Sequence, residues 1–371
     1  MAGDTAATTS GPIRLGAVGD ILLTDAASLA GDRPPRDIGD ELRRRLEACD
    51  VVFGNLECTL PGGGETVPTE PRVVASAASV ERLLADRFHV VTLANNHTFD
   101  CLDDGFHATR DMLNRLGVAW FGAGDDLAEA SAPAVLERGG VRLAFIAAVG
   151  HRSGPARFAA ENDWGVAPLD VPRLAETIAR LRDEADHVIV SVHWGEERFR
   201  IPSPKQVEQA HALADAGASL ILGHHPHVIQ GLEVYGGVPI IYSLGNFVAD
   251  DVPFSDGDVM TWTRTERTGC LLTVDLGPDG ATNVTQTPTF DSGATVEKDA
   301  SGFGDRRNAG VNRALSRGVT LGRYRREYFL VKTVGPALAR LRWSRLKRLR
   351  LRNLRNALAG LLRAEIGRAH V

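Results

Sequence analysis

Short apolar runs alternate along the chain with longer stretches in which apolar residues recur every three or four positions. The runs are rich in valine, isoleucine and leucine without polar alternation, which is typical of central strands covered on both faces. These predicted strands are Ile13–Val18, Val51–Phe53, Val90–Leu93, Val141–Ala147, Val188–Val192, Leu220–Leu222, Pro239–Tyr242 and Cys270–Leu276. The predicted helices are Asp37–Cys49, Ser79–Asp86, Phe106–Leu116, Val171–Asp183 and Lys205–Ala216. This alternation predicts an α/β layered architecture.

Polar residues that can bind metal follow almost every predicted strand. The segments are Gly19-Asp20, Gly54-Asn55-Leu56-Glu57, Ala94-Asn95-Asn96-His97, His193-Trp194-Gly195, Gly223-His224-His225-Pro226-His227 and Ser243-Leu244-Gly245-Asn246. Ligands in open α/β sheets bind at the carboxyl ends of strands, so we expect these side chains to converge. Oxygen and nitrogen donors without a thiolate suit Mn, Fe or Zn. Because paired divalent ions need a bridging carboxylate and ligands on both sides, the pattern favours a site for two metal ions.

Six of these motifs resemble a known family. GAVGDILLTD, VVFGNLE, TLANNHTFD, VHWGEE, ILGHHPHVIQ and IYSLGNFV occur in the order found in the CapA family, named for poly-γ-glutamate capsule synthesis. That family belongs to the calcineurin-like metallophosphoesterase superfamily, and the resemblance covers about residues 14–250. It implies a four-layer αββα metallophosphoesterase sandwich.

The resemblance also implies roles for individual residues. By position, the metal ligands are Asp20, Glu57, Asn96, His193, His225 and His227, with Glu57 in the place of the bridging carboxylate. His97 takes the place of the general acid, with Asp100 beside it as a second catalytic residue. The sequence departs from the superfamily pattern at Leu22, which replaces the histidine of an Asp-x-His motif, and at Glu57, which replaces a shorter aspartate.

The remaining strand-end residues form a predicted substrate-binding set: Asn95, His224, Trp194, Ser243 and Asn246. Each has an alternative. Asn95 can support the ligands from behind, and His224 can replace His225 as a ligand if the histidine run shifts by one residue. Trp194 can pack in the core instead of stacking on substrate. Ser243 and Asn246 can be turn formers instead of pocket lining.

Charge is distributed unevenly between the body and the C-terminal part of the chain. Residues 301–371 hold 18 Lys+Arg and 3 Asp+Glu, whereas the first 300 residues hold 24 and 44. After Pro336, leucines recur on one side of an arginine-rich segment, which predicts a basic amphipathic C-terminal helix. We expect it to pack on the body or a sister subunit, or to bind an anionic membrane surface. Nucleic acid is disfavoured, because the segment has one Trp and no base-reading pattern.

The expected domain organisation follows from these patterns. Residues 1–12 form a disordered N-terminus, 13–276 the CapA-like domain, 277–310 a linker with turns, and 311–371 the basic helical extension. The N-terminus has no basic and apolar regions of a signal peptide, and no apolar run of about 18 residues occurs. A cytoplasmic location, with peripheral membrane attachment as an alternative, is therefore expected. The 4 cysteines show no CxxC pair and are expected to be reduced thiols.

The function expected from these features is that of a CapA-type, metal-dependent hydrolase. Its substrate would be a small molecule or peptide containing a phosphoester or a γ-glutamyl amide. A non-hydrolytic accessory role in poly-γ-glutamate or peptide biosynthesis by acyl transfer, and a binding-only role, are the alternatives. The sequence contains no GxSxG, P-loop or strand-linked GxGxxG motif, which argues against serine-hydrolase, kinase and dinucleotide-binding functions.

Overall fold

Two stacked β-sheets form the centre of the fold in the computed structural model, which describes residues 11–24, 36–85 and 87–335. The first sheet has the order β2-β19-β18-β17-β1-β3-β4-β5, and β14 also pairs with β1. Its strands are β1 (Ile13–Leu22), β2 (Asp37–Ile38), β3 (Val51–Leu56), β4 (Val90–Thr92), β5 (Ala119–Phe121), β14 (Asn246–Ala249), β17 (Thr268–Gly277), β18 (Gly280–Asp291) and β19 (Thr295–Lys298). It combines a parallel half around β1, β3, β4 and β5 with antiparallel pairing of β1, β17, β18 and β19.

The second sheet has the order β12-β13-β11-β10-β8-β7. Its strands are β7 (Ala134–Arg138), β8 (Val141–Val149), β10 (His187–His193), β11 (Leu220–His224), β12 (Leu232–Tyr235) and β13 (Val238–Ile241). Two short pairs lie outside both sheets: β6 (Ala123–Gly124) with β9 (Gly165–Val166), and β15 (Val252–Pro253) with β16 (Val259–Met260). Four of the central strands, β8, β10, β11 and β13, run parallel, so their carboxyl ends share one edge.

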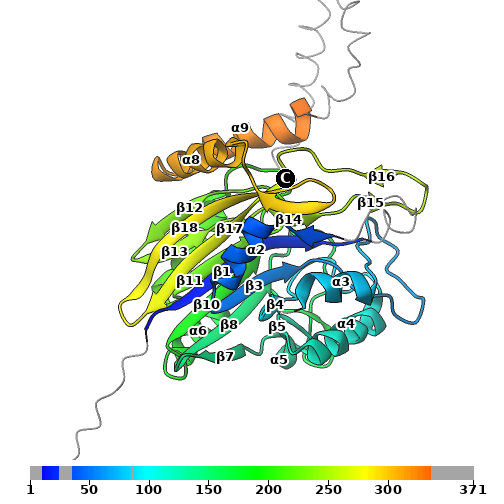
Figure 1. Cartoon of the computed structure of the whole chain (residues 1–371), viewed down its shortest axis with the longest axis horizontal. Coiled ribbons are helices and arrows are strands. Elements are labelled where there is room, and N and C mark those ends of the chain that lie inside the picture. The colour runs from blue at the N-terminus through cyan, green and yellow to red at the C-terminus, as the bar shows by residue number, and fades with distance from the viewer. Residues whose placement is uncertain (1–10, 25–35, 86, 336–371) are drawn as a thin grey trace, which may run out of the picture. The chain divides into compact units, whose positions relative to one another are not determined.

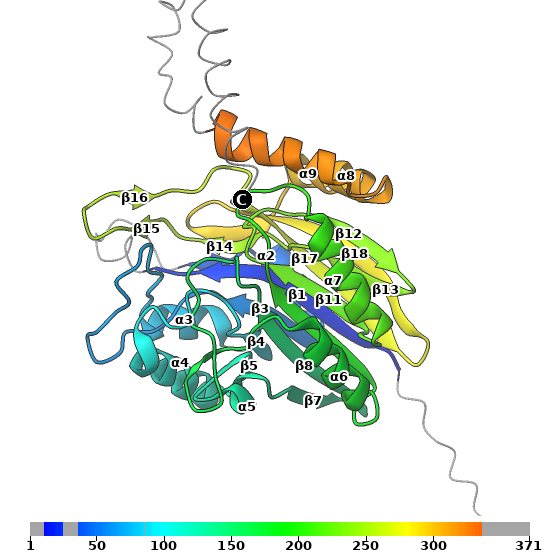
Figure 2. The same cartoon turned by 180° about the vertical axis from the view of Figure 1, so that it is seen from behind.

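The described residues form the α-helices α2 (Asp40–Glu47), α3 (Ala77–Leu84), α4 (Leu102–Leu116), α5 (Leu127–Ala130), α6 (Val171–Leu181), α7 (Pro204–Asp215), α8 (Phe303–Ser316) and α9 (Leu321–Tyr328). Several of them cover the outer faces of the two sheets. Helices α2 and α3 lie nearest the viewer in Figure 1, whereas α6 and α7 lie nearest in Figure 2, on the opposite side of the sheets. The expected four-layer αββα sandwich is therefore confirmed.

The packing of β10 shows why its mainly apolar run is a central strand. Ile189 points into the core between the sheets, where Phe53 and Phe145 stack with ring centroids 6.2 Å apart. Val188 and Val190 point the other way, into a second core formed with Ile178 and other apolar residues of α6 and α7. A strand that is buried on both faces gains from apolar residues at every position, because neither face meets water.

The prediction of a linker over residues 277–310 is wrong. Residues 280–291 form β18, 295–298 form β19, and 303–316 form α8, so the first sheet extends well beyond the expected boundary at 276. The segment is rich in threonine, which suits strands although it is not apolar. Strand β18 is held by antiparallel pairing with β17 across a tight turn, and much of its other surface is exposed. Such pairing needs no apolar pattern in the sequence.

Three further expectations can be compared with the described residues. The helix expected at Asp37–Cys49 begins at Asp40, because Asp37–Ile38 pairs with β19 as a short strand. The cysteines at 49, 58, 101 and 270 are free and buried, as expected. No helix in residues 11–24, 36–85 and 87–335 is both long and apolar enough to span a bilayer.

The chain divides into two compact units, residues 1–324 and 325–371. In the second unit, the described residues comprise the end of α9 and a π-helical segment, Phe329–Val334. The leucine stripe and arginine face expected after Pro336 lie outside the described residues, as does most of the N-terminus predicted to be disordered. The structure therefore leaves the basic helical extension a prediction.

Candidate metal centre

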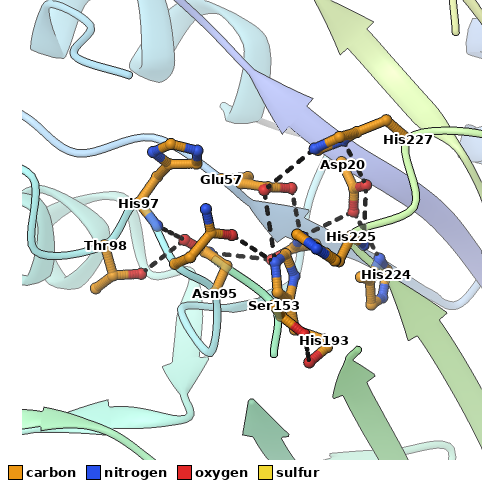
Figure 3. A network of polar contacts seen from close by, with 12 residues as sticks. Asp20, Glu57, Asn95, His97, Thr98, Ser153, His193, His224, His225 and His227 are labelled. Carbon is orange, nitrogen blue, oxygen red and sulfur yellow. Dashed lines mark hydrogen bonds and ion pairs between the residues drawn. The ribbon is translucent and has the colours of Figure 1, made fainter. Parts of the chain in front are cut away.

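The strand ends that were predicted to converge lie together at one edge of the two sheets. In the first sheet, Asp20 of β1 is in register with Asn55 of β3 and with Asn246 of β14. In the second sheet, His193 of β10 is in register with His224 of β11. Figure 3 shows the resulting cluster of carboxylates and imidazoles.

A close backbone approach fixes the position of Asp20. Its N–H donates to the carbonyl oxygen of Gly245 at 2.9 Å, across the contact between β1 and β14. A Cβ atom on Gly19 would lie 1.8 Å from that same oxygen. Only glycine at position 19 allows this approach, so the Gly-Asp sequence places Asp20 beside the Ser243-Leu244-Gly245-Asn246 segment.

The ligand atoms form two groups that share one carboxylate. The atoms of Asp20, Glu57 and His227 lie within 4.8 Å of one another, and so do those of Glu57, His193 and His225. Glu57 Oε1 lies 3.6 Å from His193 Nε2 and 3.9 Å from His227 Nε2, between the two groups. All five side chains are buried. Glu57 is thus the carboxylate that the two candidate ligand groups share.

The donors of this cluster fit divalent metal ions. Glu57 Oε1 and His225 Nδ1 are buried and have no hydrogen-bond partner among the residues that the structure describes. A buried polar atom without a partner destabilises a fold by about 1–3 kcal/mol, so two in one ligand group call for an explanation. A cation bonded to these atoms would remove that cost, and the set of carboxylate oxygens and imidazole nitrogens without thiolate suits Mn, Fe or Zn.

The backbone of the His-Pro-His segment adopts an uncommon conformation. His225 has φ 93° and His227 has φ 56°, both in the left-handed region that non-glycine residues rarely enter. Each such residue costs of order 1–3 kcal/mol and persists only where surrounding contacts hold it. The His225 N–H donates to Asp20 Oδ2 at 3.2 Å. This strained turn brings both imidazoles to Glu57.

Burial and neighbouring charges set the protonation of the cluster. Burial would raise the pKa of Asp20, but the contacts with His224 and His227 lower it well below its usual value. Burial, and then the charge of Asp20, raise the pKa of Glu57 well above its usual value. Burial, and then the neighbouring imidazole of His227, lower the pKa of His225 to about 3.

The pKa values of His193 and His227 shift in opposite directions. Burial and the charge of His225 lower the pKa of His193 well below its usual value. For His227, burial acts to lower the pKa, but the carboxylates of Glu57 and Asp20 raise it to about 10. His193 and His225 are therefore neutral in the protein without metal, and a neutral imidazole is the form that binds a metal ion.

The predicted catalytic pair lies beside the cluster. His97 Nδ1 lies 2.7 Å from Asp100 Oδ2, and this carboxylate oxygen also accepts the Val73 N–H at 2.7 Å. The amide oxygen of Asn95 accepts the His97 N–H at 3.0 Å, while its nitrogen donates to Leu56 O at 2.8 Å. Asn95 thus holds the loop after β4, which supports the alternative that it acts from behind the ligands.

Asn96 joins the loop after β4 to the second ligand group. Its Oδ1 atom lies 2.7 Å from His193 Nε2. This contact places Asn96 beside the group of Glu57, His193 and His225, which is the side on which it was expected. Its role as a ligand stays a prediction.

The other expected substrate-binding residues are distributed around the cluster. Trp194 is 1% exposed, and its Nε1–H donates to Tyr242 O at 3.0 Å, which supports the packing alternative. Ser243 Oγ accepts the Gly245 N–H at 3.2 Å, as a turn former does. Asn246 Oδ1 lies 2.9 Å from His227 Nδ1 and holds that ring, while His224 Nδ1 lies 3.0 Å from Asp20 Oδ1.

Two residues of the site were not singled out from the sequence. Asn55 donates through Nδ2 to Asp20 Oδ1 at 2.8 Å and to Glu57 Oε2 at 3.2 Å, so it holds the two carboxylates together. Its two-residue spacing from Glu57 on β3 was the available signal, because such residues share a face. Trp262 packs edge-on against His227, with ring centroids 5.2 Å apart. It comes from a distant loop without any motif.

The fold and the site together define a layered α/β protein with a candidate divalent-metal centre at the carboxyl edge of its sheets. Residues 14–251 match the family described as bacterial capsule synthesis protein PGA_cap, and the chain belongs to that family. The resemblance to the CapA family drawn from the six motifs is thereby confirmed.

Individual relatives carry names from capsule synthesis. The chain is 33% identical over 291 residues to the PGA biosynthesis protein CapA of Bacillus subtilis (strain 168), covering 76% of this chain and 73% of that protein. It is 34% identical over 229 residues to the capsule biosynthesis protein CapA of Bacillus anthracis, covering 60% and 53%. Among solved structures, a novel phosphatase from Mycoplasma pneumoniae superposes with a TM-score of 0.47 at 13% identity, covering 78% of this chain and 96% of that chain.

Proposed function

We propose that this protein is a hydrolase that depends on two divalent metal ions and cleaves γ-glutamyl amide bonds in polyglutamate-type material. The observation that carries the proposal is the position of Glu57, which belongs to both ligand groups and turns an unpaired Oε1 between them. Asp20, Glu57 and His227 would hold one ion, and Glu57, His193 and His225 the other, with Asn96 completing the second. When bound, the ions would polarise the scissile carbonyl and supply a nucleophilic water.

The protein's own residues would handle the proton of the leaving group. The contact of His97 Nδ1 with Asp100 Oδ2 fixes the orientation of the imidazole, which leaves Nε2 as the atom that can reach substrate. A protonated His97 would donate from Nε2 to the departing amine nitrogen. Because Asp100 is itself held by the Val73 N–H, the pair is oriented before substrate arrives.

The choice of a γ-glutamyl substrate is supported by the names of the relatives, which include PGA biosynthesis protein CapA. Hydrolysis of phosphoesters is a second candidate. It is favoured by the donor set itself, because a metal pair bridged by a carboxylate is also suited to displacement at phosphorus. An accessory role without hydrolysis would leave the same centre able to bind substrate without turnover.

A substrate panel tests the proposal. The full chain, reconstituted separately with Mn, Fe or Zn, would be assayed on γ-linked oligoglutamates, α-linked oligoglutamates and aryl phosphoesters. Metal-dependent release of glutamate from the γ-linked series alone is the expected result. Turnover confined to phosphoesters would show that the substrate is a phosphoester and not a γ-glutamyl amide. No turnover in any series, with two metal equivalents bound, would refute the hydrolase function.

A further inference from the structure

A cavity of about 630 Å³ lies next to the metal cluster. Its walls include Arg152 and Ser153 from the loop after β8, Gly195 and Glu196 from the loop after β10, and Lys205 and Gln206 from the first turn of α7. Trp194, which was expected to bind substrate, also lines the cavity, and no other lining residue belongs to the set expected to bind metal or substrate. The cavity is therefore a separate feature of the same edge of the second sheet.

The loop after β8 connects this cavity to the metal cluster. The Ser153 hydroxyl donates to the backbone oxygen of His193 at 3.2 Å, and Figure 3 shows Ser153 beside that histidine. The next residue, Gly154, approaches Asn96 so closely that a Cβ atom would lie 3.0 Å from its Nδ2 atom. A ligand in the cavity is thus separated from the second ligand group by one loop.

The most informative side chain of the cavity is Gln206, which is 4% exposed. Its Oε1 atom accepts the Ser203 N–H at 2.8 Å, and the Ser203 hydroxyl accepts the Gln206 N–H at 3.1 Å, forming a capping box. This arrangement commits the oxygen of the amide and leaves Nε2 as a buried donor that has no partner within the described part of the chain. A buried unpaired N–H group in a cavity wall is suited to an acceptor on a ligand.

The charges of the cavity indicate the kind of acceptor. Arg152 and Lys205 are exposed cations in its lining, and the first turn of α7 adds the positive end of a helix of 12 residues. The Lys205 contact with Glu208 at 2.9 Å joins two largely exposed side chains, so it offers little resistance to a competing anion. Glu196 gives the same wall a negative charge. A lining with both positive and negative side chains suits a ligand that carries a carboxylate beside an N–H donor.

We propose that this cavity is a subsite for the carboxylate of a glutamyl unit next to the bond at the metal centre. The carboxylate contacts Arg152, Lys205 and the Gln206 amide nitrogen, and the amide N–H of the same unit faces Glu196. The proposal rests on the proposed function for the reaction at the neighbouring centre. The recognition itself depends only on the cavity.

Gln206→Glu is the variant that tests the proposed subsite most directly. A glutamate at this helix position keeps the oxygen that caps the Ser203 N–H, and Glu is itself common in the capping box, so the start of α7 is preserved. The substitution replaces the free N–H donor with a negatively charged oxygen. Arg152→Gln removes one cation from the cavity lining. Arg138→Gln, an exposed arginine at the far end of β7, is the matched control.

The test measures binding separately from turnover. Fluorescence anisotropy of a labelled γ-linked tetraglutamate would be recorded on the full chain, metal-loaded and carrying His97→Gln to block the proposed hydrolysis. Gln206→Glu and Arg152→Gln should each weaken binding by at least about tenfold, a typical effect of losing a charge-assisted hydrogen bond, while Arg138→Gln leaves it unchanged. Equal affinities in all variants, or no binding by the parent protein, would overturn the subsite.

Two further results separate the proposals. Stronger competition by tripolyphosphate than by unlabelled tetraglutamate would overturn the carboxylate assignment, because a bare polyanion gains nothing from Glu196. If the variants lose binding as expected while the protein with His97 intact hydrolyses no member of the substrate panel, the subsite stands and the hydrolase function fails.

Discussion

The Nδ1 atom of His97 lies 2.7 Å from Oδ2 of Asp100, so the proposed proton donor is oriented by a residue that is not a proposed metal ligand. Neither residue belongs to the two ligand groups. We therefore expect His97→Gln to retain the metal content of the parent protein and to lower kcat by about 10²–10⁴-fold, the usual contribution of a general acid. Metal analysis and turnover on the active substrate are the two measurements. Full activity in the variant would remove His97 from the reaction.

Substitution of Glu57 is expected to affect both metal positions, whereas substitution of a histidine affects one, because Glu57 belongs to both groups. His225→Ala should lower the metal content from about two equivalents to about one, since its group alone loses a donor. Glu57→Gln should lower the occupancy of both positions. The measurement is metal analysis after reconstitution and gel filtration, with His151→Ala, an exposed residue, as the control. One equivalent remaining tightly bound in Glu57→Gln would show that the carboxylate is not shared.

Gly19→Ala tests the close approach of β1 to Gly245. The added Cβ would meet the Gly245 oxygen at 1.8 Å, so the strands must separate and Asp20 must move. We expect a loss of about 1–3 kcal/mol in the free energy of unfolding, as for overpacking, together with weaker metal binding. Urea unfolding and metal analysis measure the two effects. The control is Gly310→Ala in α8, where the new Cβ meets nothing within 4 Å and stability should hold or rise.

The stability of the metal-free protein should depend on pH through His225. Burial lowers the pKa of this residue in the folded state from 6.5 to about 3. Below pH 6.5 the unfolded chain therefore binds a proton that the folded protein does not, and the free energy of unfolding falls as the pH falls toward 3. His225→Asn removes this difference. Its stability should depend less steeply on pH between 6 and 4, by up to about 1.4 kcal/mol per pH unit.

Urea titrations in EDTA at several pH values measure that dependence. His151→Asn should follow the parent protein, because His151 is exposed. Metal-loaded protein should behave differently, since a bound ion excludes the proton from the ligand nitrogen. Parallel pH profiles for the parent protein and His225→Asn in EDTA would contradict the prediction.

The central strands and most of the ligand set could be predicted from the sequence because both signals are local. Runs such as Val188–Val192 are apolar at every position but Ser191, and the structure buries that run on both faces. Polar residues directly after such a run must lie at the end of a strand. Parallel strands of one sheet bring those ends together, so the ligand types at each edge could be predicted before any coordinates, while the meeting of Asp20 and Glu57 with His193 depends on how the two sheets stack.

Local patterns failed where pairing or distant loops decide the structure. Strand β18 is polar on its exposed face, and its strand conformation depends on hydrogen bonds to β17. Trp262 reaches His227 from a loop without a motif. The free amide nitrogen of Gln206 depends on a capping box and a cavity wall that form only when α7 and two loops pack together.

The sequence by itself determined the layered fold, the family and the edge of the sheets at which the metal-competent residues gather. Only the tertiary structure decided that Glu57 lies between two ligand groups, that His225 and His227 occupy left-handed backbone conformations, and that Trp194 packs inside. The reason is physical. Residue type and spacing fix which atoms can bind, whereas distances between atoms far apart in the chain arise from the packing of the two sheets.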